Sequence, residues 1–154
     1  MFILLNTEPF NADVADVSGI PTAKTVAKLG AEIWTDRNYA ISEMNNELLG
    51  ATLFKPAHYR NKATMSVTAN KKAAVYVALY EPPRDGGLMQ VLQTDGWDLT
   101  SHELEWTNIN NGSKHKLNKI WKKQVNAGST ISFTSTKDNM TFAILVKEGK
   151  YCFI

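Results

Sequence analysis

The chain has 154 residues, the length of one ordinary domain, and 44% of them are hydrophobic and 21% charged. This composition excludes an intrinsically disordered chain, a collagen and a coiled coil, and no apolar run approaches the roughly 20 residues of a membrane-spanning helix. Lysine and arginine number 17 against 15 acidic residues, so the net charge of +2 is too balanced to predict a polyanionic partner.

The N-terminus and the single cysteine bear on the compartment. Residues 1–5 are apolar but too short for the core of a secretory signal, so we expect a cytoplasmic protein, or an extracellular one if a leader has been removed. As the only cysteine, Cys152 cannot form an internal disulfide, and we interpret it as a small hydrophobic residue in a terminal strand.

Alternating apolar and polar residues dominate the chain from residue 63 onward. Residues 63–69 place apolar side chains at odd positions and hydroxyl side chains at even ones, which is typical of a strand with one face on a core. Residues 73–80 are apolar on both faces, as in a central strand. The polar turn between them, residues 70–72, predicts that the two strands pair as a β-hairpin.

Further strands are predicted on both sides of this pair. Extended segments are expected at residues 31–34, 51–54, 103–106, 129–135, 140–146 and 151–154. No long helical pattern separates them, which disfavours a parallel sheet. About eight strands at this spacing predict an all-β fold, an antiparallel β-sandwich of the jelly-roll kind.

Other regions depart from the strand pattern. Residues 82–87 contain paired prolines and paired glycines and must form a loop, while residues 88–92 fit one or two helical turns. Residues 1–30 are expected to wrap the sandwich irregularly, as a loop and a short helix. We therefore expect a single domain over residues 1–154, with the sandwich core at residues 31–154.

Positive charge is concentrated in the C-terminal third. Residues 1–105 carry a net charge of −4 and residues 106–154 a net charge of +6. One run holds five lysines: Lys114, Lys116, Lys119, Lys122 and Lys123. The run fits an amphipathic helix, or a strand with Leu117, Trp121 and Val125 facing the core, and the β-rich context favours the strand.

This lysine run supports two interpretations. As a functional feature it would bind an anionic partner, such as membrane headgroups, a protein surface or nucleic acid. As a structural feature it is a charged edge strand that prevents edge-to-edge pairing. We favour the structural interpretation, and because the chain has only three arginines we expect no nucleic-acid partner.

Aromatic residues next to charged residues in loops suggest sugar binding. A sugar ring stacks its C–H face on an aromatic ring while polar side chains hold its hydroxyls, usually on loops at one end of a rigid scaffold. Three loops have this composition, and their candidate residues are Trp97, Tyr80, Arg84, Asp85, Asp95, Tyr59 and Arg60. The alternative for each is a structural role, since a tryptophan in a turn also plugs the end of a core.

Catalytic and metal-binding patterns are weak. The three histidines are isolated, and the sequence has no zinc-ligand spacing, nucleophile elbow, phosphate loop or dinucleotide fingerprint. Glu103 and Glu105 share one face of a predicted strand, where a carboxylate pair could act, but we interpret them as a solvated face. Asp36 and Arg37 could hold a cation or ligand, but we interpret residues 34–39 as a corner in which Arg37 bridges loops. We expect no enzymatic activity, no cofactor and no metal.

The order of several segments resembles a known class of module. These segments are residues 33–39 (IWTDRNY), 48–50 (LLG), 75–80 (VYVALY) and 96–97 (GW). Their layout is similar to the discoidin or galactose-binding-like jelly rolls attached to extracellular and carbohydrate-active proteins. The likeness spans about residues 30–147, and the chain lacks the cysteine pair that ties the termini of discoidin domains, so no binding residue is carried over.

The resemblance implies a non-catalytic module that displays loops to a glycan, a lipid headgroup or a protein. Together with the aromatic loops, it predicts lectin-like binding of a glycan or glycoconjugate at the end of a sandwich. The alternative is a membrane-surface or protein-interaction module that uses the lysine run.

Overall fold

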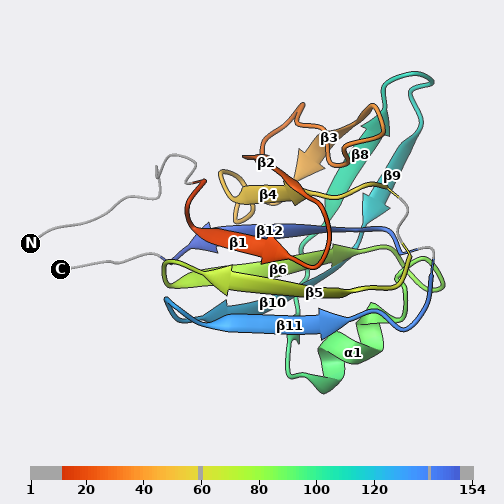
Figure 1. Cartoon of the computed structure of the whole chain (residues 1–154). Coiled ribbons are helices and arrows are strands. Elements are labelled where there is room, and N and C mark those ends of the chain that lie inside the picture. Colours follow the sequence, from red (N-terminus) through yellow and green to blue (C-terminus); the bar gives the residue numbers. More distant parts are fainter. Residues whose placement is uncertain (1–11, 59–60, 139, 150–154) are drawn as a thin grey trace, which may run out of the picture.

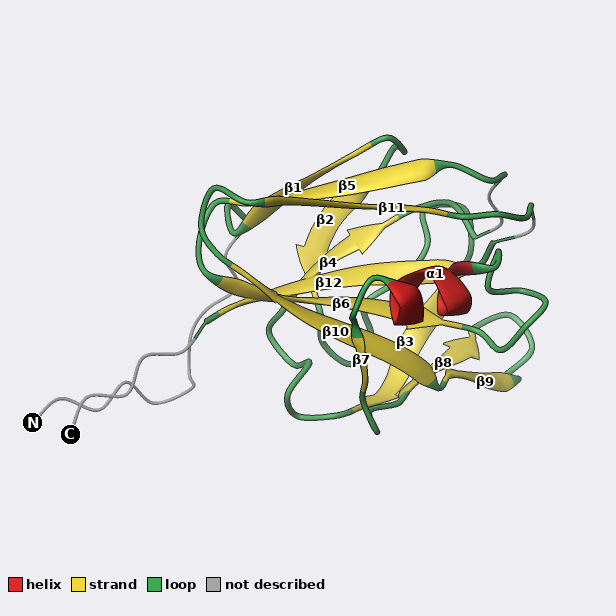
Figure 2. Ribbon diagram, turned by 90° about the horizontal axis from the view of Figure 1, so that it is seen from below, coloured by secondary structure: helices red, strands yellow, loops and turns green. Residues whose placement is uncertain are grey.

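The computed structural model describes residues 12–58, 61–138 and 140–149. They form three layers of antiparallel strands, with a six-stranded sheet between two three-stranded sheets (Figures 1 and 2). The fold is the all-β sandwich that the alternating pattern predicts, with one short helix in the described part. No helix among these residues has the length and hydrophobicity needed to cross a membrane.

The central sheet contains the strands with the most continuous apolar sequence. In order across the sheet, its strands are β2 (Ala23–Val26), β4 (Thr52–Lys55), β12 (Phe142–Glu148), β6 (Ala73–Leu79), β10 (Lys119–Val125) and β7 (Asp98–Leu99). Every residue of β6 is buried, and so are the first five of β12. These strands are apolar on both sides because strands cover both faces of the sheet.

The first outer sheet has the order β1 (Ala15–Ser18), β5 (Thr64–Ala69) and β11 (Thr130–Thr134). Its inward side chains, such as Met65 and Phe133, share a core with the central sheet. Its outward face carries hydrogen-bonded hydroxyl pairs: Thr64 with Thr134, Ser66 with Ser132 and Thr68 with Thr130. The predicted alternation of apolar and hydroxyl residues is confirmed in β5 and β11.

The second outer sheet covers the opposite face of the central sheet. Its order is β3 (Tyr39–Met44), β8 (Leu104–Asn108) and β9 (Lys114–Leu117). A second core lies between the two sheets and includes Trp34 and Trp106. The indole N–H of the fully buried Trp34 donates to the carbonyl of Phe142 at 3.0 Å, which ties the segment before β3 to the central sheet.

The predicted hairpin between residues 63–69 and 73–80 is wrong. Both strands form, but β5 pairs with β1 and β11, whereas β6 pairs with β12 and β10 in another sheet. The connecting backbone bonds elsewhere: Asn70 N–H donates to the Val14 carbonyl at 2.9 Å. A polar turn joins strands of one sheet or of two sheets equally well, so it does not predict pairing.

Other expectations also differ from the structure. The described residues hold twelve strands rather than about eight, and several of the additional ones are short. Residues 12–30 contain β1 and β2 instead of a loop and a short helix. Residues 31–34 form one isolated bridge rather than a strand. The strand expected at residues 151–154, with the cysteine, lies outside the described residues.

Helix α1 (Leu88–Thr94) forms where helical turns were predicted. The preceding loop positions it, because the Asp85 carboxylate accepts the backbone N–H groups of Gly87 and Met89 at 3.1 and 3.3 Å. Side-chain oxygens commonly satisfy the N–H groups that a helix leaves free in its first turn. Leu88 and Leu92 then bury against the first core.

Candidate functional site

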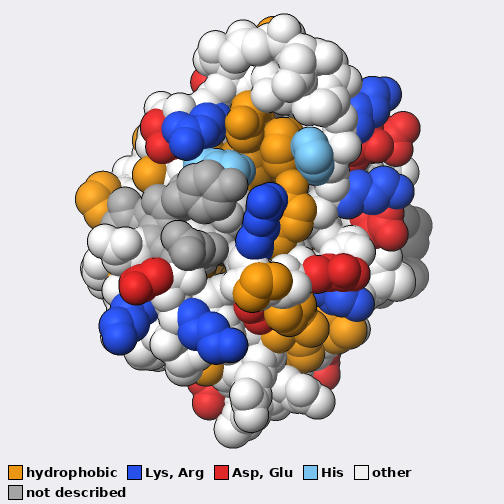
Figure 3. Space-filling view, turned by 90° about the vertical axis from the view of Figure 1, so that its right-hand side faces the viewer, with side chains coloured by type: hydrophobic (Ala, Val, Ile, Leu, Met, Phe, Trp, Pro, Cys, Tyr) orange, Lys and Arg blue, Asp and Glu red, His pale blue; other side chains and the backbone are white. Residues whose placement is uncertain are grey.

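Aromatic side chains gather at one end of the sandwich, and we call this group the aromatic end. Its members are Trp34, Tyr39, His58, Tyr80, Trp106 and His115. Three of these rings stack: the Trp106 ring centre lies 4.4 Å from that of Tyr39 and 4.6 Å from that of His115. Figure 3 shows the corresponding face, where hydrophobic side chains gather between two histidine side chains and a cationic side chain lies among them.

The strand register explains this stack. Trp106 on β8 is directly opposite His115 on β9, and β3 pairs along the other side of β8. Large side chains on one face of adjacent strands are close enough to stack. Trp34 supports the row from the core, edge-on to Trp106 at 5.4 Å between ring centres. Trp106, in the middle of the stack, is only 4% exposed, so its position is fixed by packing. His115, at one end of the stack, is exposed to solvent.

Tyr80 and Arg84 bring the loop after β6 to the same end. Tyr80 is half-buried and meets the Trp106 ring edge-on, with 6.4 Å between centres. The exposed Arg84 guanidinium lies 5.8 Å from the centre of the Tyr80 ring. The Arg84 backbone is held on both sides, because its N–H donates to the Glu81 carbonyl and its own carbonyl accepts from Thr141. A partly open ring and a cation are therefore presented by a fixed loop.

Charged groups of both signs surround the aromatic end. Burial lowers the pKa of His58 to about 4, and the cations Arg37 and Arg84 lower it further, with a small contribution from His115, while Asp36 acts in the opposite direction. Asp36 is engaged within the chain: one oxygen accepts the His58 backbone N–H at 2.8 Å and the other contacts the Arg37 guanidinium at 3.1 Å. Thus Asp36, through His58, makes the link between loops that the sequence analysis expected of Arg37.

Several buried polar atoms near this end have no hydrogen-bond partner among the described residues. Among them are Nε1 of Trp106 and Oδ1 of Asn118. The Asn118 side-chain amide donates to Glu81 at 3.2 Å, and Glu81 directly follows Tyr80, which places Asn118 beside the aromatic end. Buried polar atoms in proteins are normally paired, so this donor and this acceptor are exceptions, and both are shielded from solvent in this structure.

Of the seven residues predicted to bind a sugar, the structure brings two together here, Tyr80 and Arg84. Asp95 is exposed near the end of α1 and lines a separate pocket of about 280 Å³. Tyr59 and Arg60 lie outside the described residues.

Trp97 and Asp85 are turned inward. Trp97 is 5% exposed and packs edge-on against Phe133 in the first core, with 5.7 Å between ring centres. Asp85 is 3% exposed and binds the backbone at the start of α1. In this structure Trp97 therefore presents no open ring face for stacking, and Asp85 supports the loop that carries Arg84.

The local sequence patterns do not single out Tyr39, Trp106 or His115 as site residues. All three lie on strands. The one local indication was that Trp106 is two residues from the apolar Leu104 and so lies on the same, inward face of the strand. Their meeting depends on the register between strands that are far apart in the chain. That register cannot be predicted from any local pattern in the sequence.

The lysine run forms two strands, β9 and β10, as the strand interpretation predicts, and Leu117, Trp121 and Val125 are buried. Four of its five lysines contact polar groups of the chain: Lys114 with Glu105, Lys116 with Glu103, Lys122 with Glu47 and Lys123 with the Asp95 carbonyl. Three of these contacts are ion pairs with acidic side chains, so much of the positive charge of the run is offset locally.

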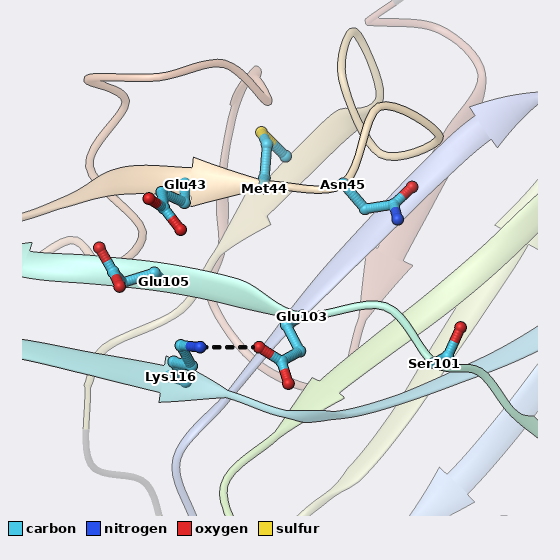
Figure 4. A pocket seen from close by; sticks show the side chains of 7 residues that line it. All are labelled: Glu43, Met44, Asn45, Ser101, Glu103, Glu105 and Lys116. Carbon is cyan, nitrogen blue, oxygen red and sulfur yellow. Dashed lines mark hydrogen bonds and ion pairs between the residues drawn. The ribbon is translucent and has the colours of Figure 1, made fainter.

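A carboxylate pocket of about 290 Å³ lies on the outward face of the second outer sheet (Figure 4). It is lined by Glu43, Met44, Asn45, Ser101, Glu103, Glu105 and Lys116. Lys116 pairs with Glu103 at 3.0 Å, and the Ser42 hydroxyl donates to Glu105 at 2.7 Å. Across the described residues, no three histidine, cysteine or acidic side chains form a group suited to a metal ion.

Glu47 is the centre of a second charged network. Its carboxylate accepts from Lys122 at 2.9 Å and contacts the ring nitrogen of His102, and its carbonyl accepts from Lys147 at 2.7 Å. Burial raises the pKa of Glu47, but hydrogen bonds from Lys122, Tyr76 and His102 outweigh it and lower the pKa to about 2. Burial and the neighbouring Glu47 raise the pKa of Tyr76. This network ties the loop after β3 to the central sheet.

No protein-family model matches this chain, and no curated protein matches it in sequence. Among solved structures, it is similar to part of a β-glucuronidase from glycoside hydrolase family 2, with a TM-score of 0.59 and 15% identity over 93% of this chain. It is also similar to part of a glycoside hydrolase family 138 enzyme targeting pectin rhamnogalacturonan II, with a TM-score of 0.55 and 15% identity over 96% of this chain. The chain spans 14% and 18% of the lengths of these two proteins. At this identity the likeness concerns the fold, a β-sandwich that also occurs as part of carbohydrate-active enzymes.

Proposed function

We propose that this chain is a non-catalytic glycan-binding module whose ligand lies on the aromatic end. The observation that carries the proposal is the exposed Arg84 beside the half-buried Tyr80, next to the stacked rings of Tyr39, Trp106 and His115. The C–H face of a sugar stacks on the open part of the Tyr80 ring, and polar groups around it hold the hydroxyls.

The fold supports this proposal. Loops at the end of a rigid sandwich are where binding residues usually concentrate, and Tyr80 and Arg84 lie on such a loop. The two similar structures are chains of carbohydrate-active enzymes. The lectin-like character and the resemblance to galactose-binding-like and discoidin modules belong to this same proposal.

The state of the carboxylates favours binding over catalysis. Hydrolysis of a glycosidic bond needs a carboxylic acid that holds its proton near neutral pH, close to a second carboxylate. Glu103 is paired with Lys116, and hydrogen bonds lower the pKa of Glu47 to about 2 even though burial opposes them. Glu47 is therefore a poor proton donor near neutral pH, and Glu103 is occupied by its ion pair with Lys116.

Glycan-array binding of the purified chain tests the proposal. We expect the wild-type protein to bind a subset of glycans, and Tyr80→Ala to weaken that binding about tenfold or more, because losing a central aromatic contact commonly costs more than about 1 kcal/mol. Tyr80→Phe keeps the ring and should retain stacking.

Leu29→Ala is a suitable control, because Leu29 is also a large apolar side chain, is 58% exposed and lies outside the aromatic end. It should bind the same glycans as the wild type. If a folded Tyr80→Ala variant binds like the wild type, the ligand does not sit on the aromatic end. If the wild type binds no glycan, the proposed function is wrong.

A further inference from the structure

Arg84 is an exposed cation beside the aromatic end, and no acidic side chain among the described residues forms an ion pair with it. The described part of the chain contains several ion pairs, and none of them includes Arg84. Its guanidinium lies over the Tyr80 ring, 5.8 Å from Cζ to the ring centre. Tyr80 is only half-buried, so part of its side chain is still open to solvent.

The acidic groups nearby are already engaged. Asp36 accepts the His58 backbone N–H and contacts Arg37, and Glu81 accepts the amide of Asn118. Neither carboxylate neutralises Arg84, although Glu81 is three residues away in the same loop. A guanidinium fork on a fixed loop therefore remains free to meet an anion from outside.

We propose that the glycan bound at the aromatic end is acidic, with the carboxylate of a uronic acid paired with Arg84. This inference rests on the proposed function and adds the class of sugar. A planar guanidinium matches a carboxylate with two parallel N–H···O bonds. In a uronic acid the carboxylate is attached directly to the ring carbon, so a sugar stacked on Tyr80 carries its charge at the rim of the ring.

The charge of Arg84 also bears on the class of sugar. Burial is the main reason that the pKa of His58 is low, and the cations Arg37 and Arg84 contribute to it, which places both near His58 at the aromatic end. Of these two cations, Arg37 is already paired with Asp36. A neutral sugar would leave the Arg84 charge without a counter-charge in the complex. The carboxylate of an anionic sugar supplies that counter-charge.

Titration calorimetry at low salt tests the inference. The probes are uronate trisaccharides (galacturonate, glucuronate and mannuronate), the same trisaccharides with each carboxyl reduced to a hydroxymethyl, and a sulfated neutral trisaccharide. We expect the wild type to bind at least one uronate trisaccharide about tenfold or more tightly than its reduced form, the usual scale for a charge-assisted pair. Arg84→Gln should remove this preference, and Arg84→Lys, which keeps the positive charge, should retain part of it.

Lys71→Gln is the matched control, because it removes one positive charge from an exposed turn at the opposite end of β6. It should keep the full preference for uronates. Melting temperatures of all variants establish that each is folded under the assay conditions.

The outcomes separate this inference from the proposed function. If the wild type binds the reduced and uronate forms equally and Tyr80→Ala loses both, the acidic ligand is wrong and the glycan-binding proposal stands. If Arg84→Gln keeps the preference, Arg84 is not the partner of the carboxylate. Tighter binding of the sulfated sugar than of any uronate overturns the carboxylate assignment. If no probe binds and the glycan array is also empty, both proposals are wrong.

Discussion

Residues in the loops of this sandwich occupy similar sequence surroundings but have different roles. Trp97 and Tyr80 both stand next to turn residues and charged residues, yet the first fills the core and the second is partly open to solvent. What separates them is whether the chain turns the ring toward or away from the sheets, and this choice depends on the packing of α1 and the central sheet.

The burial of Trp97 predicts a loss of stability when it is truncated. Trp97→Ala should lower the free energy of unfolding by about 3–5 kcal/mol, because it leaves a cavity next to Phe133. Urea denaturation measures this change. A loss of less than about 1 kcal/mol, together with lost glycan binding, would instead place Trp97 in the ligand site.

Replacing Asp85 should reduce stability by less than replacing Trp97, and it should also weaken ligand binding. Asp85→Ala removes the acceptor for two backbone N–H groups, and the protein should lose about 0.5–2 kcal/mol of stability. Because the same loop carries Arg84, ligand binding should weaken as well, although Asp85 itself is buried. Calorimetry and urea denaturation of one preparation compare the two effects, and unchanged values for both would contradict this role.

At the scale of the elements, strand existence and strand pairing have different origins. β5 and β6 follow from alternation and continuous hydrophobicity, which are local properties of the chain. Their assignment to two sheets depends on partners far away, such as β11 and β12. The lysine run behaves in the same way: its strands were predictable, whereas its ion pairs with Glu47, Glu103 and Glu105 depend on the sheet order.

Close packing between elements predicts which glycines cannot be replaced. Gly19 lies between β1 and β2 with a φ of +93°, and a Cβ there would be 2.0 Å from the Thr64 carbonyl oxygen. Gly30 has a similar φ of +89° but no atom within 4 Å of such a Cβ.

Both alanine variants bear the strain of a positive φ, but only Gly19→Ala adds a backbone clash, so it should be less stable than Gly30→Ala by about 1–3 kcal/mol. Denaturation midpoints of the two variants measure the difference. Equal stabilities would show that β1 does not pack against β5 as described.

At the scale of the whole molecule, two groups with lowered pKa values, the buried His58 and the half-buried Glu47, predict sensitivity to acid. His58 has a folded pKa of about 4 against an ordinary value of 6.5, so as the pH falls between these values the unfolded chain takes up a proton that the folded chain does not. Glu47 has a folded pKa of about 2 against 4.5, so its stabilising contribution is lost as the pH falls from about 4.5 to 2.

The free energy of unfolding should therefore decrease steadily from pH 6.5 to pH 2. Urea denaturation at a series of pH values measures this profile. Glu47→Gln should flatten the lower part of the profile and leave the upper part unchanged. A profile that is level between pH 6.5 and 4 would contradict the burial of a neutral His58.

The sequence by itself determined the all-β class, most of the strands and the helix after the Pro-Gly loop, because the two-residue period and the backbone limits of proline and glycine act over a few neighbouring residues. It also predicted Tyr80 and Arg84 as candidate ligand contacts, since Tyr80 leads directly into the Pro-Gly loop that carries Arg84, and this remains a prediction. Only the tertiary structure decided the sheet order, the inward turn of Trp97 and the row of Tyr39, Trp106 and His115. That row spans strands separated by up to 76 residues, and its rings meet because hydrogen bonding between β3, β8 and β9 sets one register out of several that the local sequence permits.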